Sequence, residues 1–401
     1  MIGGVLKSYK MKYKIHIRSS VFFWYSDNNV LFYDTESASF LFIPLSDEIQ
    51  KICMILSNPS SLYSFVYDTE NINVSQFVEE LISKGFCVED DGKESLISLP
   101  PILCVNNNWE IIKKKGQYKL VTELLKSIVF LMGGSELETS IERLEHLANI
   151  EYDLKGNALM DLSVLDAFLT DNSITQLNRL SFVIGAKCSS GYIDKLMKLV
   201  TKHDLENKVQ AYVLINSSEE GVEQLINNIP IPVHPVFVSI SDGPSITLAG
   251  SIFLVQSKEE VNKAMEFISA NQLEDCILYP QYNGQNHSFY ECEVFPNIDE
   301  LFENRISKRQ IFIHRTLNVN YFGQLIVLPN AQVYSSLLRP AIGRLSDGIY
   351  SLVYSEMENN YLWRKTRNML SRCKECLYCD LCPSPILEEE LMNVECPYMV
   401  N

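Results

Sequence analysis

The chain has 401 residues, of which 46% are hydrophobic and 21% charged, as in a soluble protein of two or three domains. Its 34 Lys and Arg against 50 Asp and Glu give a formal charge of −16, so it has no general attraction for nucleic acid or an anionic membrane. No apolar run is long enough to span a bilayer, and residues 1–14 lack the apolar core of a secretory signal. We therefore expect a cytoplasmic protein.

The first hundred residues predict short strands followed by helices. Four apolar runs separated by polar turns predict a meander of strands at 15–17, 21–25, 30–33 and 40–43. Ser46 and Asp47 begin a predicted helix that Pro59 ends. Asn73 begins a second helix, which Gly85 ends, and a strand at 86–88 closes the region. The apolar face of the second helix comprises Phe77, Val78, Leu81 and Ile82.

A helix–turn–helix of this kind suggests DNA binding, but the charge of the second helix argues against it. Residues 73–84 contain one lysine, Lys84, and two glutamates, Glu79 and Glu80. A recognition helix exposes basic and amide groups toward phosphates and bases. We therefore predict no nucleic acid partner.

The order of these elements, in "NVLFYDTESASFLFIPLSDEIQKI" and "NVSQFVEELISKGFCVED", resembles a PqqD-like peptide-recognition domain of ribosomal peptide maturation. The resemblance implies a winged-helix-like domain over 1–98, to which a leader peptide adds as an extra strand. It places the open edge at Phe40, Leu41, Phe42 and Ile43, and the groove wall at Phe77, Glu80, Leu81 and Lys84. The alternative is that these apolar side chains belong to the domain core.

Residues 99–310 alternate strand-like and helix-like segments. The predicted strands are 127–132, 180–185, 209–215, 235–240, 251–255 and 276–279, and the predicted helices are 135–148, 192–203, 218–228 and 258–270. Repeated βα units with continuously apolar strands predict an α/β fold with a parallel sheet or partial (βα) barrel. Gly133 and Gly134 are interpreted as a strand-to-helix turn, because no phosphate-loop motif surrounds them.

The βα alternation stops after residue 310. We predict strands at 310–315 and 323–328, a hairpin turn at 329–332, and a return strand at 333–334. An amphipathic helix is expected from Gly348 to about Arg372, through Trp363.

Five of the eleven cysteines lie near the end of the chain. Cys373, Cys376, Cys379 and Cys382 follow one another at x2 spacing, and Cys396 comes later. Thiolates at this spacing can converge on a metal or cluster. Abutting pairs would strain a zinc site, and a bacterial ferredoxin run has x3 before its last cysteine. A third arrangement uses Cys373, Cys376, Cys382 and Cys396, with Cys379 as a bystander.

This third arrangement resembles the SPASM iron–sulfur domain that follows the barrel of many radical SAM enzymes. The segments "FGQLIVLPNAQVYSS", "AIGRLSDG" and "LCPSP" carry the likeness. It implies a SPASM-like domain over 311–401 with one [4Fe–4S] cluster, and zinc is the alternative. The family's inner cluster lacks its ligands here, since Ser335, Ser336 and Ile386 occupy their positions.

The radical SAM motif itself is missing. No C-x3-C-x2-C occurs in the chain, and "GGSELETSIERL", after the first predicted barrel strand, has no cysteine. The chain thus resembles a pseudo-radical-SAM/SPASM protein of GG-type peptide maturation systems, with a degenerate barrel over 99–310, no SAM site and no catalytic residues. The resemblance implies binding of a ribosomal precursor peptide and docking on an active radical SAM enzyme. The alternatives are an electron-transfer subunit, an enzyme of other chemistry, or a zinc-stabilised interaction protein.

Overall fold

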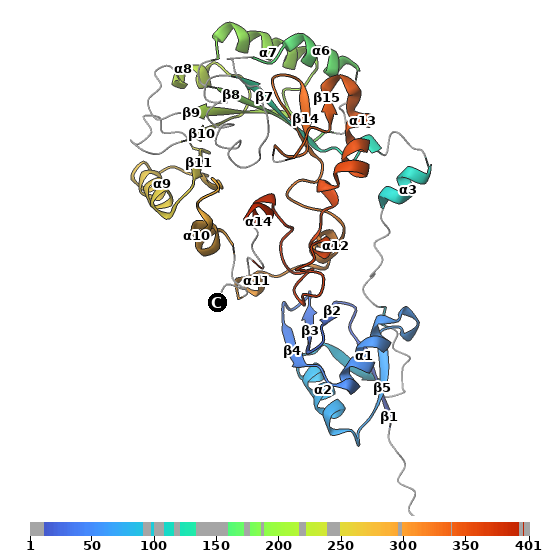
Figure 1. Ribbon diagram of the computed structural model, residues 1–401. Helices are drawn as coiled ribbons and strands as arrows, with labels where there is room; N and C mark the ends of the chain where they lie inside the picture. Colours follow the sequence, from blue (N-terminus) through green and yellow to red (C-terminus); the bar gives the residue numbers. More distant parts are fainter. Residues whose placement is uncertain are drawn as a thin grey trace, which may run out of the picture. The chain divides into compact units, whose positions relative to one another are not determined.

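The computed structural model describes residues 12–90, 98–99, 108–115, 121–133, 159–171, 177–185, 188–215, 222–238, 249–295, 299–337, 339–392 and 396. The chain is an α/β protein that packs as two compact units (Figure 1). Unit 1 comprises Met1–Asn107, Ile298–Thr316 and Thr366–Pro383. Unit 2 comprises Asn108–Asn297, Leu317–Lys365 and Ser384–Asn401. None of the described helices has the length and apolarity needed to cross a bilayer.

These units group the chain differently from ranges drawn along the sequence. The ranges 1–98, 99–310 and 311–401 remain a prediction about domain identity. By packing, the segment that carries four of the terminal cysteines belongs with the N-terminal strands, while Cys396 belongs to unit 2.

Unit 1 contains two small antiparallel sheets, in the orders β2-β3-β4 and β5-β1-β6. Its strands are β1 Lys12–Ile17, β2 Val21–Tyr25, β3 Asn29–Asp34, β4 Phe40–Pro44, β5 Ser64–Asp68 and β6 Cys87–Asp90. Its helices are α1 Asp47–Ser57, α2 Ile72–Ser83, α11 Glu300–Glu303 and α12 Lys308–Thr316, with short 3₁₀ turns at Pro59–Ser61 and Arg367–Met369.

The strands and helix α1 lie close to their predicted positions. Ser46 caps α1 as expected, because its side chain accepts a hydrogen bond from the Ile49 N–H. The cap predicted at Asn73 is wrong: Asn71 caps α2 and accepts from the Val74 N–H. The buried face comprises Val74, Phe77, Val78 and Leu81, whereas Ile82, predicted on the same face, is 40% exposed.

The meander sheet of unit 1 is covered on both faces. One face packs against α1, α2 and β1 through a core that includes Phe32, Ile52 and Phe77. The opposite face carries Phe22, Leu31 and Tyr33, which pack against Ile306, Ile311 and Leu381 from the later segments. Alternating side chains of β3 therefore enter two different cores, as expected for a strand with both faces buried.

Unit 2 is built around a nine-stranded sheet. Its strands are β7 Ser127–Gly133, β8 Arg179–Gly185, β9 Val209–Ile215, β10 Val233–Phe237, β11 Ile252–Val255, β12 Ile277–Pro280, β13 Gln324–Val327, β14 Gln332–Tyr334 and β15 Gly343–Arg344. Its helices are α3 Asn108–Lys115, α6 Leu162–Asp171, α7 Ser190–Lys202, α8 Val222–Asn227, α9 Lys258–Ala270, α10 His287–Phe289, α13 Gly348–Ser355 and α14 Leu387–Leu391. Short π and 3₁₀ turns lie at Tyr290–Val294, Leu345–Asp347, Glu356–Asn360 and Leu362–Arg364.

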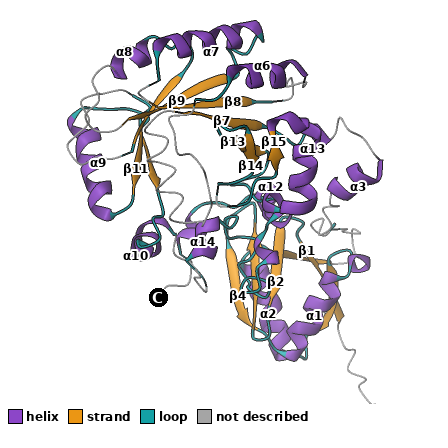
Figure 2. Ribbon diagram, turned by 45° about the horizontal axis from the view of Figure 1, so that its top comes forward, coloured by secondary structure: helices purple, strands orange, loops and turns teal. Residues whose placement is uncertain are grey.

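The sheet order is β12-β11-β10-β9-β8-β7-β13-β14-β15, and β7 to β13 all pair in parallel. Because β7 to β12 follow in chain order, right-handed crossovers place their helices on one side of the sheet. Figure 2 shows α6, α7, α8 and α9 along that side. The predicted parallel sheet is confirmed.

The sheet curls strongly. Four strands separate β11 from β13, which in a flat sheet is a distance of roughly 24 Å. Leu254 of β11 and Ile326 of β13 nevertheless line one pocket of about 370 Å³. The face away from the helices is therefore concave, and it holds an apolar cluster that includes Leu131, Leu214 and Tyr334.

Two predictions for the C-terminal third are wrong. Residues 308–316 form helix α12 rather than a strand, because Ser307 accepts from the Gln310 N–H and its hydroxyl reaches the Gln310 side chain. The helix expected to run to about Arg372 ends earlier. A π turn follows α13, and Tyr361 then takes a left-handed conformation with φ of 60°.

The predicted helix 135–148 lies outside the described residues, as does Gly134. Gly133 ends β7 with φ of 102°, a conformation that favours glycine and suits the interpretation of a turn after this strand.

Candidate functional site

Strand β4 carries the residues predicted to bind a peptide. It pairs with β3 on one side, and no described strand pairs with it on the other. Phe40 and Phe42 are 43% and 46% exposed, whereas Leu41 is half-buried and Ile43 is 8% exposed. The two phenylalanines thus point to one face of the sheet and Leu41 and Ile43 to the core, as the pleat requires.

The hydrogen bonds at the two ends of β4 fix which backbone groups face its open edge. The Asp34 N–H donates to the Ser39 carbonyl, and the Leu45 N–H donates to the Asn28 carbonyl. Backbone groups alternate in an antiparallel pair, so residues 39, 41, 43 and 45 bond toward β3. Phe40 and Phe42 therefore direct their N–H and C=O groups away from β3, and Pro44 has no N–H to offer.

Helix α2 does not form the predicted wall in full. Phe77 and Leu81 are 2% and 0% exposed and belong to the core of unit 1, where the Phe77 ring lies 5.8 Å from that of Phe32. Their assignment to a groove wall is corrected, because buried side chains cannot contact a peptide. Glu80 and Lys84 are exposed.

The outer face of β4 has an aromatic neighbour that the sequence pattern did not indicate. The Phe302 ring of α11 stacks on Phe40, with 4.3 Å between ring centroids. Phe302 also contacts Tyr33 and Tyr378. This contact fixes one end of the exposed aromatic pair and leaves Phe42 as the more accessible ring.

The cysteine segment packs on the outer face of the same sheet and contacts β2. Cys373, Cys379 and Cys382 are each 5 or 6% exposed, and Cys376 is half-buried. The Cys379 thiol donates to the Asn368 side-chain oxygen at 3.0 Å. Burial raises the pKa of Cys379 to about 12, and the neighbouring Asp380, Cys373 and Cys376 add to that rise. Cys379 is therefore a protonated thiol at neutral pH.

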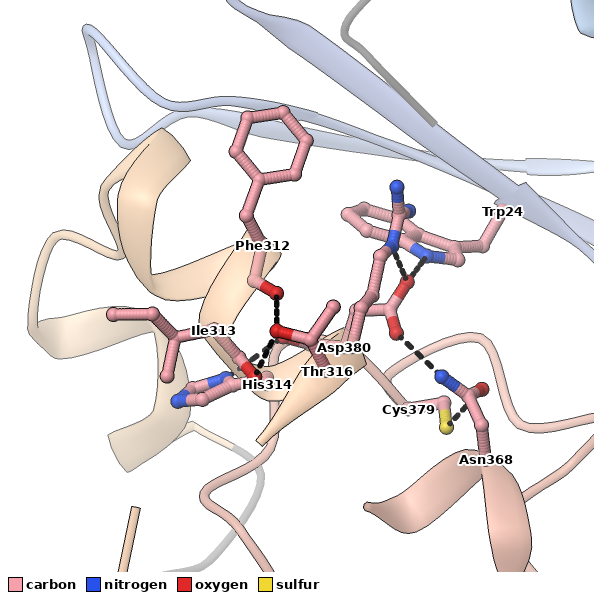
Figure 3. A network of polar contacts seen from close by, with 9 residues as sticks. Trp24, Phe312, Ile313, His314, Thr316, Asn368, Cys379 and Asp380 are labelled. Atoms are coloured by element: carbon pink, nitrogen blue, oxygen red, sulfur yellow. Dashed lines mark hydrogen bonds and ion pairs between the residues drawn. The ribbon is translucent and has the colours of Figure 1, made fainter. Parts of the chain in front are cut away.

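Asp380 anchors this segment to the sheet and to α12, as Figure 3 shows. Its carboxylate accepts hydrogen bonds from the Trp24 indole at 2.7 Å, the Arg315 Nε at 2.6 Å and the Asn368 amide at 3.1 Å. Its backbone carbonyl accepts from His314 Nδ1 at 2.9 Å. Since a carbonyl oxygen only accepts, the neutral His314 ring carries its proton on Nδ1.

The anchored segment leaves a pocket of about 250 Å³ against β2. Trp24 and Tyr25 line it from the strand, and Asn368, Cys376 and Cys379 line it from the cysteine segment. The pocket thus presents aromatic rings and two thiols together. The cysteines have a recognisable spacing in the sequence, whereas Trp24, Arg315, Asn368 and Asp380 belong to no motif. No spacing rule connects residues so far apart in the chain, so the sequence held no signal for this network.

A metal centre requires the sulfurs to converge. Among the described residues, no group of three or more His, Cys, Asp or Glu side chains lies close enough to hold a metal ion. Cys373, Cys376 and Cys379 are near enough for their charges to interact, but Cys379 is engaged with Asn368. The ligand set predicted from the sequence, Cys373, Cys376, Cys382 and Cys396, leaves Cys379 out, so the cluster and its zinc alternative stay predictions, and we derive no chemistry through either group.

No protein-family model matches the sequence, and a search of curated proteins found no match.

Proposed function

We propose that this protein binds an extended segment of a ribosomal precursor peptide by strand addition along β4 and assists a partner radical SAM enzyme that modifies it. The observation that carries the proposal is the open edge of β4, with two residues whose backbone groups point away from β3. The likeness of 1–98 to PqqD-like domains, stated from the sequence, supports the same use of this strand.

The open edge of β4 can pair with only a short peptide segment. Phe40 and Phe42 supply two N–H and two C=O groups, which is enough for up to four main-chain hydrogen bonds to an incoming strand. Pro44 ends the donor row, and such a proline also protects an edge against unspecific pairing. Every second side chain of a peptide placed here would lie on the face of the sheet that carries the exposed Phe42 ring.

The charged residues named for the peptide groove give a further criterion for the peptide. Glu80 in α2 and Lys84 at its C-cap are both exposed and lie one helical turn apart. A peptide that combines an apolar residue for Phe42 with charges of both signs is the best match. The lack of C-x3-C-x2-C in the chain is our reason for proposing that a separate enzyme carries out the chemistry.

The test removes one backbone N–H, that of Phe42, which points away from β3. A displayed library of random peptides is selected on the purified protein, and the affinity of an enriched peptide is measured by fluorescence anisotropy. Phe42→Ala keeps the outward N–H, whereas Phe42→Pro removes it without removing a hydrogen bond to β3. We expect Phe42→Pro to bind five- to tenfold more weakly than Phe42→Ala, the effect of about 1 kcal/mol for one hydrogen bond.

Leu41→Pro is the matched control for folding, because that N–H points toward β3 and its loss should destabilise the sheet. Circular dichroism must show Phe42→Pro as folded as Phe42→Ala. If the two Phe42 variants bind equally, the peptide does not add to β4 and the proposal fails.

A further inference from the structure

The pocket inside the curled sheet of unit 2 is a second candidate for ligand binding, and it does not depend on peptide binding at β4. Its apolar walls are Leu254 and Ile326, and its volume is about 370 Å³. Tyr279, Tyr282 and Tyr321 bring three aromatic rings to its lining. Ser336 and Gln281 add polar groups. An aromatic pocket with a few polar side chains is typical of a small-molecule site.

One charged residue lines this pocket. Glu388, in α14, is its only described acid, and no described Lys, Arg or His shares the lining. No described cationic side chain forms an ion pair with the Glu388 carboxylate, although its neighbour Glu390 pairs with Arg339 and Lys365. Burial raises the pKa of Glu388 above its usual range, which is what an uncompensated carboxylate in an apolar pocket experiences.

Hydrogen bonds fix two of the three lining tyrosines. The Tyr282 hydroxyl bonds to His287 Nε2 at 2.8 Å, and the two rings meet edge to face. The Tyr321 hydroxyl accepts from the Leu387 N–H at 3.2 Å, directly before Glu388. Ring faces attract ammonium groups, and several rings around one carboxylate form a cage for an organic cation.

We infer that this pocket binds a primary alkylammonium group, with Glu388 as the counter-ion and the tyrosine rings as the cage. The group comes either from a lysine side chain of a peptide or from a free aliphatic amine. A divalent metal ion fits less well, because one carboxylate among hydroxyl and amide groups supplies too little charge. The formal charge of −16 favours the approach of any cation.

Titration calorimetry on the full chain tests this inference with three probes: N-acetyl-lysine methylamide, n-butylammonium and N-acetyl-norleucine methylamide. The first two share the ammonium group, and the third is a neutral analogue of the first. We expect one or both amines to bind and the neutral probe not to bind. Preference for the lysine derivative would assign a peptide source, and preference for butylammonium would assign a free amine.

Glu388→Gln should weaken amine binding at least tenfold. Glu390→Gln, on the same helix but outside the pocket lining, should change it less than twofold. Tyr279→Ala, at an exposed edge-strand position, should weaken binding several-fold, whereas Tyr279→Phe keeps the ring and should not. Absence of saturable amine binding, or equal binding of the neutral probe, overturns the inference. So does unchanged affinity in a folded Glu388→Gln protein.

Discussion

Asp380 should control how tightly the cysteine segment is held to unit 1. It is 5% exposed, and its carboxylate is shared by Trp24, Arg315 and Asn368. Arg315 is itself largely buried, with its guanidinium 5.5 Å from the centroid of the Phe22 ring. Removing the carboxylate therefore leaves a buried cation without its partner.

The size of the effect follows from these contacts. Asp380→Ala leaves the guanidinium uncompensated, which typically costs about 3–5 kcal/mol when a buried pair is broken. Asp380→Asn keeps the shape and one acceptor oxygen, but it loses the charge that strengthens the bonds from Trp24 and Arg315. We expect Asp380→Asn to cost about 2–3 kcal/mol, since each charge-assisted bond contributes roughly 1.5–3 kcal/mol.

Hydrogen–deuterium exchange read by mass spectrometry measures this cost locally, in the peptides that span 366–383. A loss of 2–3 kcal/mol raises the population of the open segment about 30- to 150-fold, at roughly 1.4 kcal/mol per tenfold change. The control is Asp27→Asn, the same substitution at an exposed position of unit 1.

Two results would refute the reasoning. One is exchange in 366–383 that stays at the wild-type rate in Asp380→Asn. The other is full additivity between Asp380→Asn and Arg315→Gln, because residues that share a buried ion pair must couple.

Three further outcomes are expected. Burial lowers the pKa of His314, so the stability that the neutral ring contributes is present above about pH 6.5 and is lost as pH falls through the lowered pKa. In urea unfolding, His314→Gln should lack this loss of stability at acidic pH, and a variant that loses as much stability as the wild type would contradict the prediction. In metal-free protein, iodoacetamide should label the half-buried Cys376 faster than Cys379, as mass spectrometry can show; equal labelling of the two thiols would contradict this order. Gly323→Ala should cost about 1–3 kcal/mol in urea unfolding, because φ is 78° and the new Cβ would lie 2.9 Å from a backbone oxygen; wild-type stability would disprove the strain.

The elements that the sequence predicted well are those with a strong local signal. The strands of the meander and helix α1 have clear alternation or a clear cap, and Ser46 acts as that cap. Helix α12 was mistaken for a strand because Ile311, Phe312 and Ile313 look β-rich. The Ser307-x-x-Gln310 capping box was the competing signal, and it decides the structure.

Local sequence signals do not determine how the candidate sites are assembled. The spacing of the cysteines indicated a metal site, but spacing cannot tell whether the sulfurs converge. Phe77 has the helical periodicity of a groove wall and of a core residue alike, and only burial separates the two. Asp380 and Arg315 are 65 residues apart in the chain, so their pairing depends on tertiary packing that no motif encodes.

The discontinuity of unit 1 has a consequence during synthesis on the ribosome. The outer face of β3 emerges early, yet the residues that cover it, such as Ile311 and Leu381, are made hundreds of residues later. At a translation rate of roughly 5–20 residues per second, about 20–70 s pass between the synthesis of Tyr33 and that of Leu381, which covers it. Over that interval the nascent chain exposes an aromatic sheet face, so expression should depend on chaperones, and a fragment that ends near residue 107 should aggregate.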